Sequence, residues 1–239
     1  MRPFVIGHAA AGGEAPANTL AGVYACLAGK ADGMEIDIRL SADGVPVLMH
    51  DETVERTTNR TGRVASLMYS ELAGADAGGG QPVPALEQVL DAVDGRLVVM
   101  CELKSTPGTN DQDSRLVEAI LRVVRRHGSL RWTAVHSFNP EIVRSVRELE
   151  PKMSTAIIAP PMVGDGLAWL LDTAVESGCQ AVSLEHSCLT AESVHVVSSR
   201  QLTVWAWTPD TEDDWRRLST AGVGGIITNY PRRLREFPW

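Results

Sequence analysis

The sequence predicts a TIM-type (β/α)8 barrel that forms a single domain over residues 1–239. Short β-rich apolar runs alternate with longer segments of helical period from end to end, which is typical of βα units around a parallel sheet. Acidic residues and histidines also follow several of these runs, where barrel enzymes place their catalytic groups. A Rossmann sheet would alternate in the same way, but no GxGxxG motif follows the first run. The barrel is therefore the better prediction.

The candidate strands exceed the eight places of a barrel by one. The run 46–49 follows the run 33–38 after a turn at Asp43 and Gly44, which leaves no room for a crossover helix of about a dozen residues. We therefore interpret 46–49 as an extra strand. The full set of expected strands is 4–7, 33–38, 46–49, 97–103, 133–138, 153–158, 181–184, 202–207 and 225–228.

Helices are expected between these strands, where apolar residues recur at helical spacing. In the segment 116–127, Leu116, Ile120, Val123 and Val124 would share one face. At the start of another helix, Asn18 or Thr19 can cap the first turn. The expected helices cover 18–29, 116–127, 141–149, 167–177, 191–199 and 212–221.

Length and charge favour a single-domain protein and argue against nucleic-acid-binding and membrane-spanning proteins. A chain of 239 residues with 44% hydrophobic residues can bury one large core. The net charge is −8 and no basic cluster occurs, which argues against a nucleic-acid partner. No run approaches the roughly 20 apolar residues that span a bilayer, and no export signal opens the chain. We expect a cytoplasmic protein without a membrane span.

Three carboxylates and a lysine are predicted to face the barrel interior. Residues two apart in a strand point to the same side, so Glu35 would share a face with Asp37, and Glu102 with Lys104. Buried carboxylates need compensation, and a shared divalent cation provides it. The all-oxygen ligand set of Glu35, Asp37 and Glu102 favours Mg²⁺ or Ca²⁺.

Two histidines are expected at the same rim as this cation. His8 follows the first run and His50 follows the run VPVLMH. One imidazole can deprotonate a nucleophile at phosphorus while the other protonates the leaving alkoxide. Taken separately, a strand-end histidine or a Glu-x-Asp pair is more often structural, but here all of these residues fall at the ends of early strands.

Three segments carry a resemblance to a known family: IGHAAAGGEAPANTL, ADGMEIDIRLSADGVPVLMHDETVERTTNRTG and VMCELK. Further matches are the SF pair at 137–138, VWAWT at 204–208 and GVGGIITNYP at 222–231. With these motifs in order over almost the whole chain, the sequence resembles the glycerophosphodiester phosphodiesterase family, whose members are TIM barrels of the phospholipase-C-like phosphodiesterase type.

The resemblance implies a role for each candidate residue. A divalent metal would be held at the positions of Glu35, Asp37 and Glu102, with His8 and His50 as the acid–base pair. It also implies that Lys104 contacts phosphate and that Trp207 walls the substrate pocket.

The sequence departs from the family pattern at two motifs. The usual HRG and PENT read His8-Ala9-Ala10 and Pro16-Ala17-Asn18-Thr19, so the arginine and the glutamate are replaced by Ala9 and Ala17. Alanine cannot replace the planar fork of donors that arginine offers to phosphate.

The leading hypothesis is metal-dependent cleavage of a small phosphodiester that carries glycerol or a similar alcohol. Attack by water and attack by a neighbouring hydroxyl, which gives a cyclic phosphate, would use the same two histidines. One alternative keeps the barrel and the metal but applies them to diphosphate or other phosphate-ester chemistry, because a fold does not determine a reaction. A second alternative is a binding protein without turnover. No oligomeric state is predicted.

Overall fold

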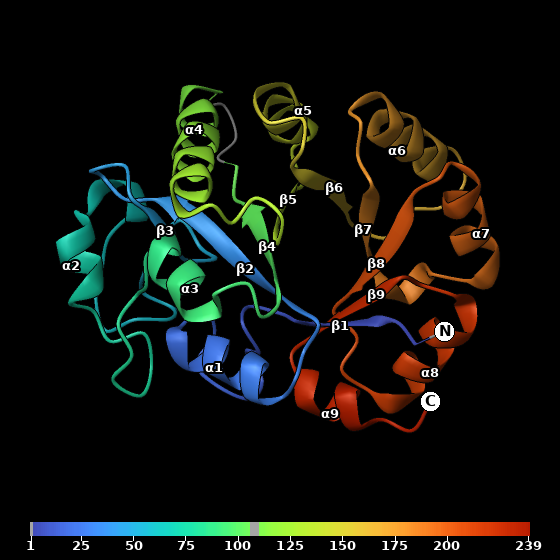
Figure 1. The fold of residues 1–239 in the computed structure, drawn as a ribbon, viewed down its shortest axis with the longest axis horizontal. Helices are drawn as coiled ribbons and strands as arrows, with labels where there is room; N and C mark the ends of the chain where they lie inside the picture. Colours follow the sequence, from blue (N-terminus) through green and yellow to red (C-terminus); the bar gives the residue numbers. More distant parts are fainter. Residues whose placement is uncertain (1, 106–109) are drawn as a thin grey trace.

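Eight parallel strands close into a barrel in the computed structural model, which describes residues 2–105 and 110–239. The strand order is β1-β9-β8-β7-β6-β5-β4-β2, and the pairing of β1 with β2 closes the ring (Figure 1). This confirms the predicted TIM-type (β/α)8 barrel. Its strands are β1 (Phe4–Gly7), β2 (Gly33–Leu40), β4 (Val98–Leu103), β5 (Thr133–Ser137), β6 (Ser154–Ala159), β7 (Ala181–Glu185), β8 (Thr203–Trp207) and β9 (Gly225–Thr228).

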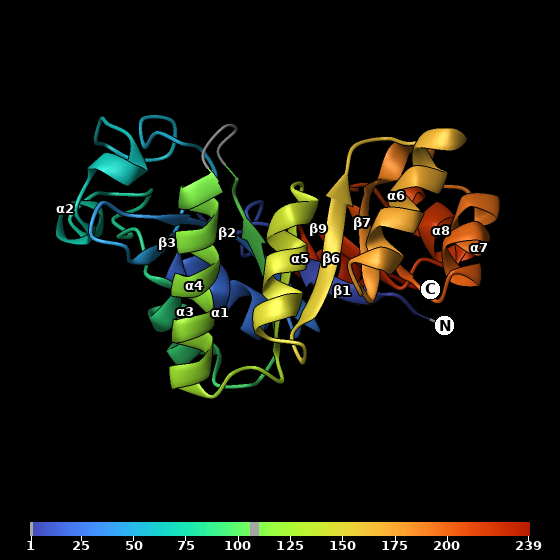
Figure 2. The ribbon, with the colours of Figure 1, turned by 90° about the horizontal axis from the view of Figure 1, so that it is seen from above.

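Helices surround the strands, and the two chain ends lie near each other on one side of the ring (Figures 1 and 2). Several helices begin at side chains that accept a hydrogen bond from the free N–H groups of the first turn, including Thr19, Asn139, Thr190 and Thr211. The surrounding helices are α1 (Leu20–Ala28), α3 (Leu86–Val93), α4 (Asn110–His127), α5 (Pro140–Leu149), α6 (Asp165–Glu176), α7 (Ala191–Ser199), α8 (Glu212–Ala221) and α9 (Pro231–Glu236).

The segment 41–85 leaves the ring between β2 and α3, and we call it the β2–β4 insertion. It contains β3 (Pro46–Leu48), a 3-10 turn (Val64–Ser66) and α2 (Tyr69–Ala73), and it projects from one side of the barrel (Figures 1 and 2). β3 pairs antiparallel with the C-terminal half of β2, which confirms that it is extra to the barrel. The insertion has its own buried apolar cluster, formed by Val47, Met49, Val54, Val64, Leu72, Ala75 and Val83.

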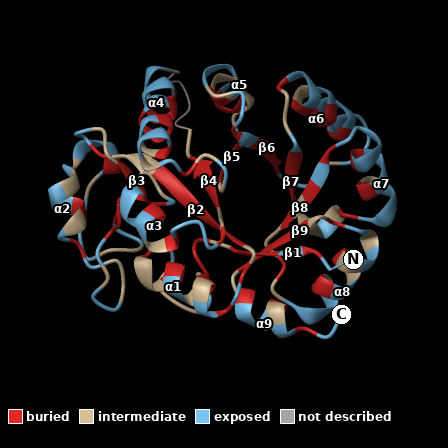
Figure 3. Cartoon of the chain, in the orientation of Figure 1, coloured by how far each residue is buried: buried red, intermediate tan, exposed pale blue. Residues whose placement is uncertain are grey.

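Burial follows the layers of the barrel: strands are buried, and the outer faces of the helices are exposed (Figure 3). Inside the ring, Ile6, Met100, Ala134 and Ile227 form a separate apolar cluster against which Trp205 and Trp207 pack. Inward-facing residues are two apart along a strand. The next inward-facing positions of β1, β4 and β5 are therefore two residues further along each strand. They lie above the apolar layer, at the C-terminal end of the barrel.

Three short helices, α2, α3 and α9, were not predicted from the sequence. α2 and α9, with five and six residues, are too short to show a helical period, whereas in α3 the eight residues do place Leu86, Val89, Leu90 and Val93 at helical spacing, so that signal was available. α4 and α6 begin earlier than predicted, at Asn110 and Asp165, because the first turns of α4 are polar and those of α6 contain a glycine. Among the described helices, none is long and apolar enough to cross a membrane.

Candidate active site

Three acidic side chains lie buried inside the barrel. Glu35, Asp37 and Glu102 are 2%, 1% and 8% exposed. Glu35 and Asp37 share the inward face of β2, and Asp37 is the register partner of Glu102 on β4. The structure therefore brings together the three carboxylates that the sequence singles out.

Lys104 contacts two of these carboxylates, Asp37 and Glu102, and Asn18 contacts Asp37. Lys104 Nζ lies 2.8 Å from Asp37 Oδ1 and also contacts Glu102 Oε1. Asn18 Nδ2 donates to Asp37 Oδ2 at 2.6 Å, and the Asp37 N–H donates to Asn18 Oδ1 at 3.1 Å. With the carboxylates ionised, one lysine leaves the group with two excess negative charges.

Burial and neighbouring charges shift the titration of this group in opposite directions. Burial raises the pKa of Glu102, and the carboxylates of Glu35 and Asp37 add to this against the effect of Lys104. Burial would also raise the pKa of Glu35, but His136, His8 and Lys104 outweigh it and lower that pKa to about 2. Burial opposes the charge on Lys104 too, but Asp37 and Glu102 raise its pKa.

His8 lies at the C-terminal end of β1, and its orientation is fixed by residues after β9. Its Nδ1 lies 2.8 Å from Asn229 Oδ1, while Asn229 Nδ2 donates to Asp210 Oδ2 at 2.7 Å. Because a carboxylate accepts and does not donate, Asn229 must turn its oxygen toward His8, so Nδ1 carries the proton. Nε2 then faces Glu35, with 3.9 Å to Oε2. Burial lowers the pKa of His8, but Glu35 and Asn229 outweigh this and raise it above its usual value.

His50 is oriented in a similar way within the β2–β4 insertion. Its Nδ1 lies 2.7 Å from Asp51 Oδ1, and Arg56 Nε donates to the other oxygen of that carboxylate. The Arg56 hydrogen bond holds the pKa of Asp51 well below its usual range, with a further contribution from His50. Asp51 therefore accepts the Nδ1 proton, and both histidines are left with a free Nε2.

A third histidine, His136, joins the carboxylates, and sequence reasoning does not single it out. It lies on β5 as the register partner of Glu102 and is 2% exposed. Its Nε2 is 3.6 Å from Glu35 Oε1. Ligand atoms of Glu35, Glu102 and His136 all lie within 4.8 Å of one another, as a metal site requires. The alternation of the run 133–138 was the available signal, since it puts His136 on the face opposite Val135.

The loop after β1 brings a backbone donor to the carboxylates. Ala9, Ala10 and Ala11 have φ angles of 45°, 53° and 59°, which cost about 1–2 kcal/mol each for residues with a Cβ. In return the Ala9 N–H donates to Glu35 Oε2 at 3.0 Å, and the Ala10 N–H donates to the Glu35 carbonyl at 2.9 Å. This loop also packs on α1, since a Cβ at Gly22 would lie 1.9 Å from the Ala10 carbonyl oxygen.

A cavity of about 450 Å³ opens at this end of the barrel. Its walls include both candidate catalytic histidines, Asp37 and residues of the β1 loop and the β2–β4 insertion. Trp207 is not among the lining residues: it packs edge-on against Phe138 with ring centroids 5.8 Å apart. The lining residues are His8, Ala9, Gly12, Ala17, Asn18, Asp37, Leu48, Met49, His50, Asp51, Arg56, Thr57, Ala77 and Asn229.

The residues present fit a divalent cation. Glu35 Oε1 is buried and has no hydrogen-bond partner among the described residues, although leaving a buried polar atom unpaired costs free energy. Carboxylate oxygens are suitable ligands for such an ion, and its charge would balance the excess of two negative charges. The site can thus combine a cation with two imidazoles that present a free nitrogen to one cavity.

Comparisons with solved structures support the fold. A glycerophosphodiester phosphodiesterase from Agrobacterium tumefaciens str. C58 superposes with a TM-score of 0.82 and 26% identity, over 99% of this chain and 100% of that one. An Oleispira antarctica phosphodiesterase, solved with the product sn-glycerol-3-phosphate, gives a TM-score of 0.89 at 24% identity, over 98% and 96% of the chains. Both are similar to this protein over nearly their full lengths.

Sequence comparisons identify the family. YhdW of Bacillus subtilis strain 168 is 31% identical over 95% of each chain. The glycerophosphodiester phosphodiesterase of Caldanaerobacter subterraneus subsp. tengcongensis is 28% identical over 98% of this chain and 97% of its own. The model of the glycerophosphoryl diester phosphodiesterase family matches residues 8–233. The chain therefore belongs to the glycerophosphoryl diester phosphodiesterase family.

Proposed function

We propose that this phosphoric diester hydrolase cleaves small glycerophosphodiesters to glycerol 3-phosphate and a free alcohol. The observation that carries the proposal is the pairing of a buried, doubly negative carboxylate group with two imidazoles whose Nδ1 atoms are both anchored. Glu35, Asp37 and Glu102 would hold a divalent cation, and an all-oxygen ligand set favours Mg²⁺ or Ca²⁺. Family membership supports the substrate class.

In the proposed reaction, a water oxygen forms a bond to phosphorus as the phosphorus–oxygen bond to the alcohol breaks. One histidine, neutral, takes a proton from the water at its Nε2, and the other, protonated at Nε2 as well as Nδ1, gives its Nε2 proton to the departing alkoxide, so the summed charge of the two imidazoles is unchanged. His8 and His50 are the two groups placed for this. When bound, the cation would stabilise negative charge on the phosphoryl oxygens.

Phosphate recognition must differ from the family pattern, because the usual arginine and glutamate are replaced by Ala9 and Ala17. Both alanines line the cavity, and the paired loss of opposite charges leaves the net charge of the site unchanged. Lys104 would contact the phosphate from its position beside Asp37, and Arg56 adds a guanidinium to the cavity wall. Trp207 packs on Phe138 at the end of β8, outside the lining of this cavity, so it would contact only a substrate that extends beyond the cavity.

Phosphorus NMR of a phosphodiester panel tests the function. With Mg²⁺ or Ca²⁺ present, glycerophosphodiesters should give a phosphomonoester signal that disappears when the cation is chelated. Asp37→Asn should reduce turnover at least about a hundredfold, since it removes a charge from the cation site. Asp213→Asn changes a carboxylate whose side chain is 98% exposed and serves as the control. Turnover of diphosphates with glycerophosphodiesters untouched, or turnover insensitive to chelation, would contradict the proposal.

A second prediction concerns the carboxylate that anchors His50. Asp51→Asn is expected to lower kcat about tenfold to a hundredfold, part of the 10²–10⁴ that an acid–base group contributes. The amide lacks the charge that fixes the imidazole tautomer and pairs with Arg56. The pH profile of kcat should also shift, while KM changes little. Glu52→Gln, which removes the neighbouring ion pair with Arg63, provides the control. Equal kinetics in the two variants would remove Asp51 from the mechanism.

A further inference from the structure

His136 is a buried imidazole with no hydrogen bond on either nitrogen among the described residues. Its side chain is 3% exposed, and both Nδ1 and Nε2 lack a hydrogen bond within the described chain. Leaving a buried polar group unpaired costs about 1–3 kcal/mol. Each of the two acid–base histidines, in contrast, has an anchored Nδ1. His136 therefore needs an explanation that the proposed proton transfers do not provide.

An ion pair with Glu35 does not account for the burial of His136 without hydrogen bonds. The 3.6 Å between His136 Nε2 and Glu35 Oε1 is too long for a hydrogen bond, and Oε1 is itself unpartnered. A protonated imidazole would also bury a positive charge whose Nε2–H has no acceptor at hydrogen-bond distance among the described residues. Two unpaired atoms that face each other across this distance are better explained by something that binds between them.

We propose that His136 is a ligand of the same cation as Glu35 and Glu102, which makes the centre a mixed nitrogen and oxygen site. This rests on the cation site of the proposed function. Ligand atoms of these residues lie within 4.8 Å of one another, and the strand register pairs His136 directly with Glu102. A neutral imidazole adds no charge, so the balance between the divalent cation and the carboxylate group is kept.

A nitrogen ligand changes which cation the site prefers. Mg²⁺ and Ca²⁺ bind oxygen ligands, whereas imidazole suits Zn²⁺, Ni²⁺ and Cu²⁺. This chain should therefore bind the transition cations more tightly than the all-oxygen set of Glu35, Asp37 and Glu102 would. Transition cations should likewise support activity in solution at lower concentrations than an all-oxygen site would require.

Pulsed EPR of the Mn²⁺-loaded protein tests the ligand directly. The wild type should show nitrogen hyperfine coupling to Mn²⁺, and His136→Gln should lose it while still binding the ion, because the amide puts an oxygen in place of the nitrogen. His8→Gln is the matched control, because His8 Nε2 is the other imidazole nitrogen near Glu35, 3.9 Å from Oε2. Coupling that survives in His136→Gln, or that disappears in His8→Gln instead, would overturn the proposal.

Calorimetry with each cation provides a second measurement. His136→Gln should weaken binding of Zn²⁺ about tenfold or more, and of Mg²⁺ less than about threefold. An equal loss for all cations, or no loss, would contradict the nitrogen ligand and leave the proposed hydrolase intact. If the wild type binds none of these cations, the proposed function fails as well.

A third measurement does not depend on a variant that folds. In histidine-labelled wild type, Zn²⁺ should shift the ring-nitrogen NMR signal of His136 more than those of His8 and His50. An unshifted His136 signal in the Zn²⁺-bound protein would count against the proposal.

Discussion

Substituting His50 with alanine is expected to lower kcat about 10²- to 10⁴-fold while cation binding stays close to normal. His50 is the more exposed of the two anchored imidazoles and lies in the β2–β4 insertion, outside the carboxylate cluster. Its removal therefore takes away a proton-transfer group and leaves Glu35 and Glu102 in place. Steady-state kinetics and calorimetry on the same preparation measure the two quantities.

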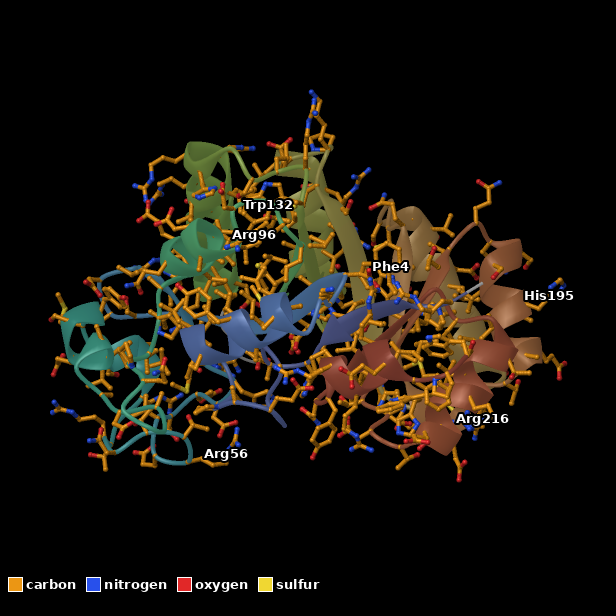
Figure 4. All side chains as sticks on the ribbon, turned by 60° about the horizontal axis from the view of Figure 1, so that its bottom comes forward. Phe4, Arg56, Arg96, Trp132, His195 and Arg216 are labelled. Carbon is orange, nitrogen blue, oxygen red and sulfur yellow. The ribbon has the colours of Figure 1, made fainter. Side chains whose placement is uncertain are left out.

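His195→Ala is the matched control for this variant. His195 is exposed on α7 and lies at the opposite end of the molecule from Arg56, the partner of the carboxylate that anchors His50 (Figure 4). The control should keep wild-type kcat. Equal activity in His50→Ala and His195→Ala would exclude His50 from proton transfer, and a parallel loss of cation affinity would indicate a role as a ligand.

Gly22→Ala is expected to destabilise the fold by about 3 kcal/mol, at the upper end of the usual cost of overpacking. The added Cβ would lie 1.9 Å from the carbonyl oxygen of Ala10, which is backbone and cannot rotate away. Either α1 or the left-handed loop must move, and Ala9 in that loop holds Glu35. Urea unfolding should show the loss of stability, and activity should fall with it.

Gly166→Ala gives the comparison for this variant. Gly166 also lies in a helix, α6, but a Cβ there meets no atom within 4 Å. Replacing a helical glycine in open space should stabilise the protein by about 0.5–1 kcal/mol. The two variants should therefore have effects of opposite sign, and a Gly22→Ala protein as stable as Gly166→Ala would show that the contact with Ala10 does not constrain the fold.

The barrel was predictable because its strands are short apolar runs separated by segments of helical period. The extra strand β3 followed from chain length, since the turn at Asp43 and Gly44 leaves no room for a crossover helix. The insertion built on that strand was not predictable. Its small core joins Val47 to Val83, and such contacts between distant residues leave no local period in the sequence.

The inward carboxylates followed from strand alternation, but their partners did not. Asn229 reaches His8 across 221 positions, because ring closure puts β9 beside β1. His136 faces Glu102 only in the register of β4 and β5, and alternation does not give the stagger between strands. The face to which a side chain points can thus be predicted from the sequence of its own strand. Which residue of another strand it contacts depends on the register in which the barrel closes.

The apolar cluster of Ile6, Met100, Ala134 and Ile227 affects how a cation and a substrate can reach the carboxylates. Ile6, Met100 and Ala134 lie two residues before His8, Glu102 and His136, so the cluster lies in the barrel beneath the carboxylates. We therefore expect cation, water and substrate to enter through the cavity lined by His8, Asp37 and His50, and both products to leave through it. A product that stays bound in this cavity would block release of the cation beneath it. Metal exchange should therefore be slower in the product complex than in the free enzyme.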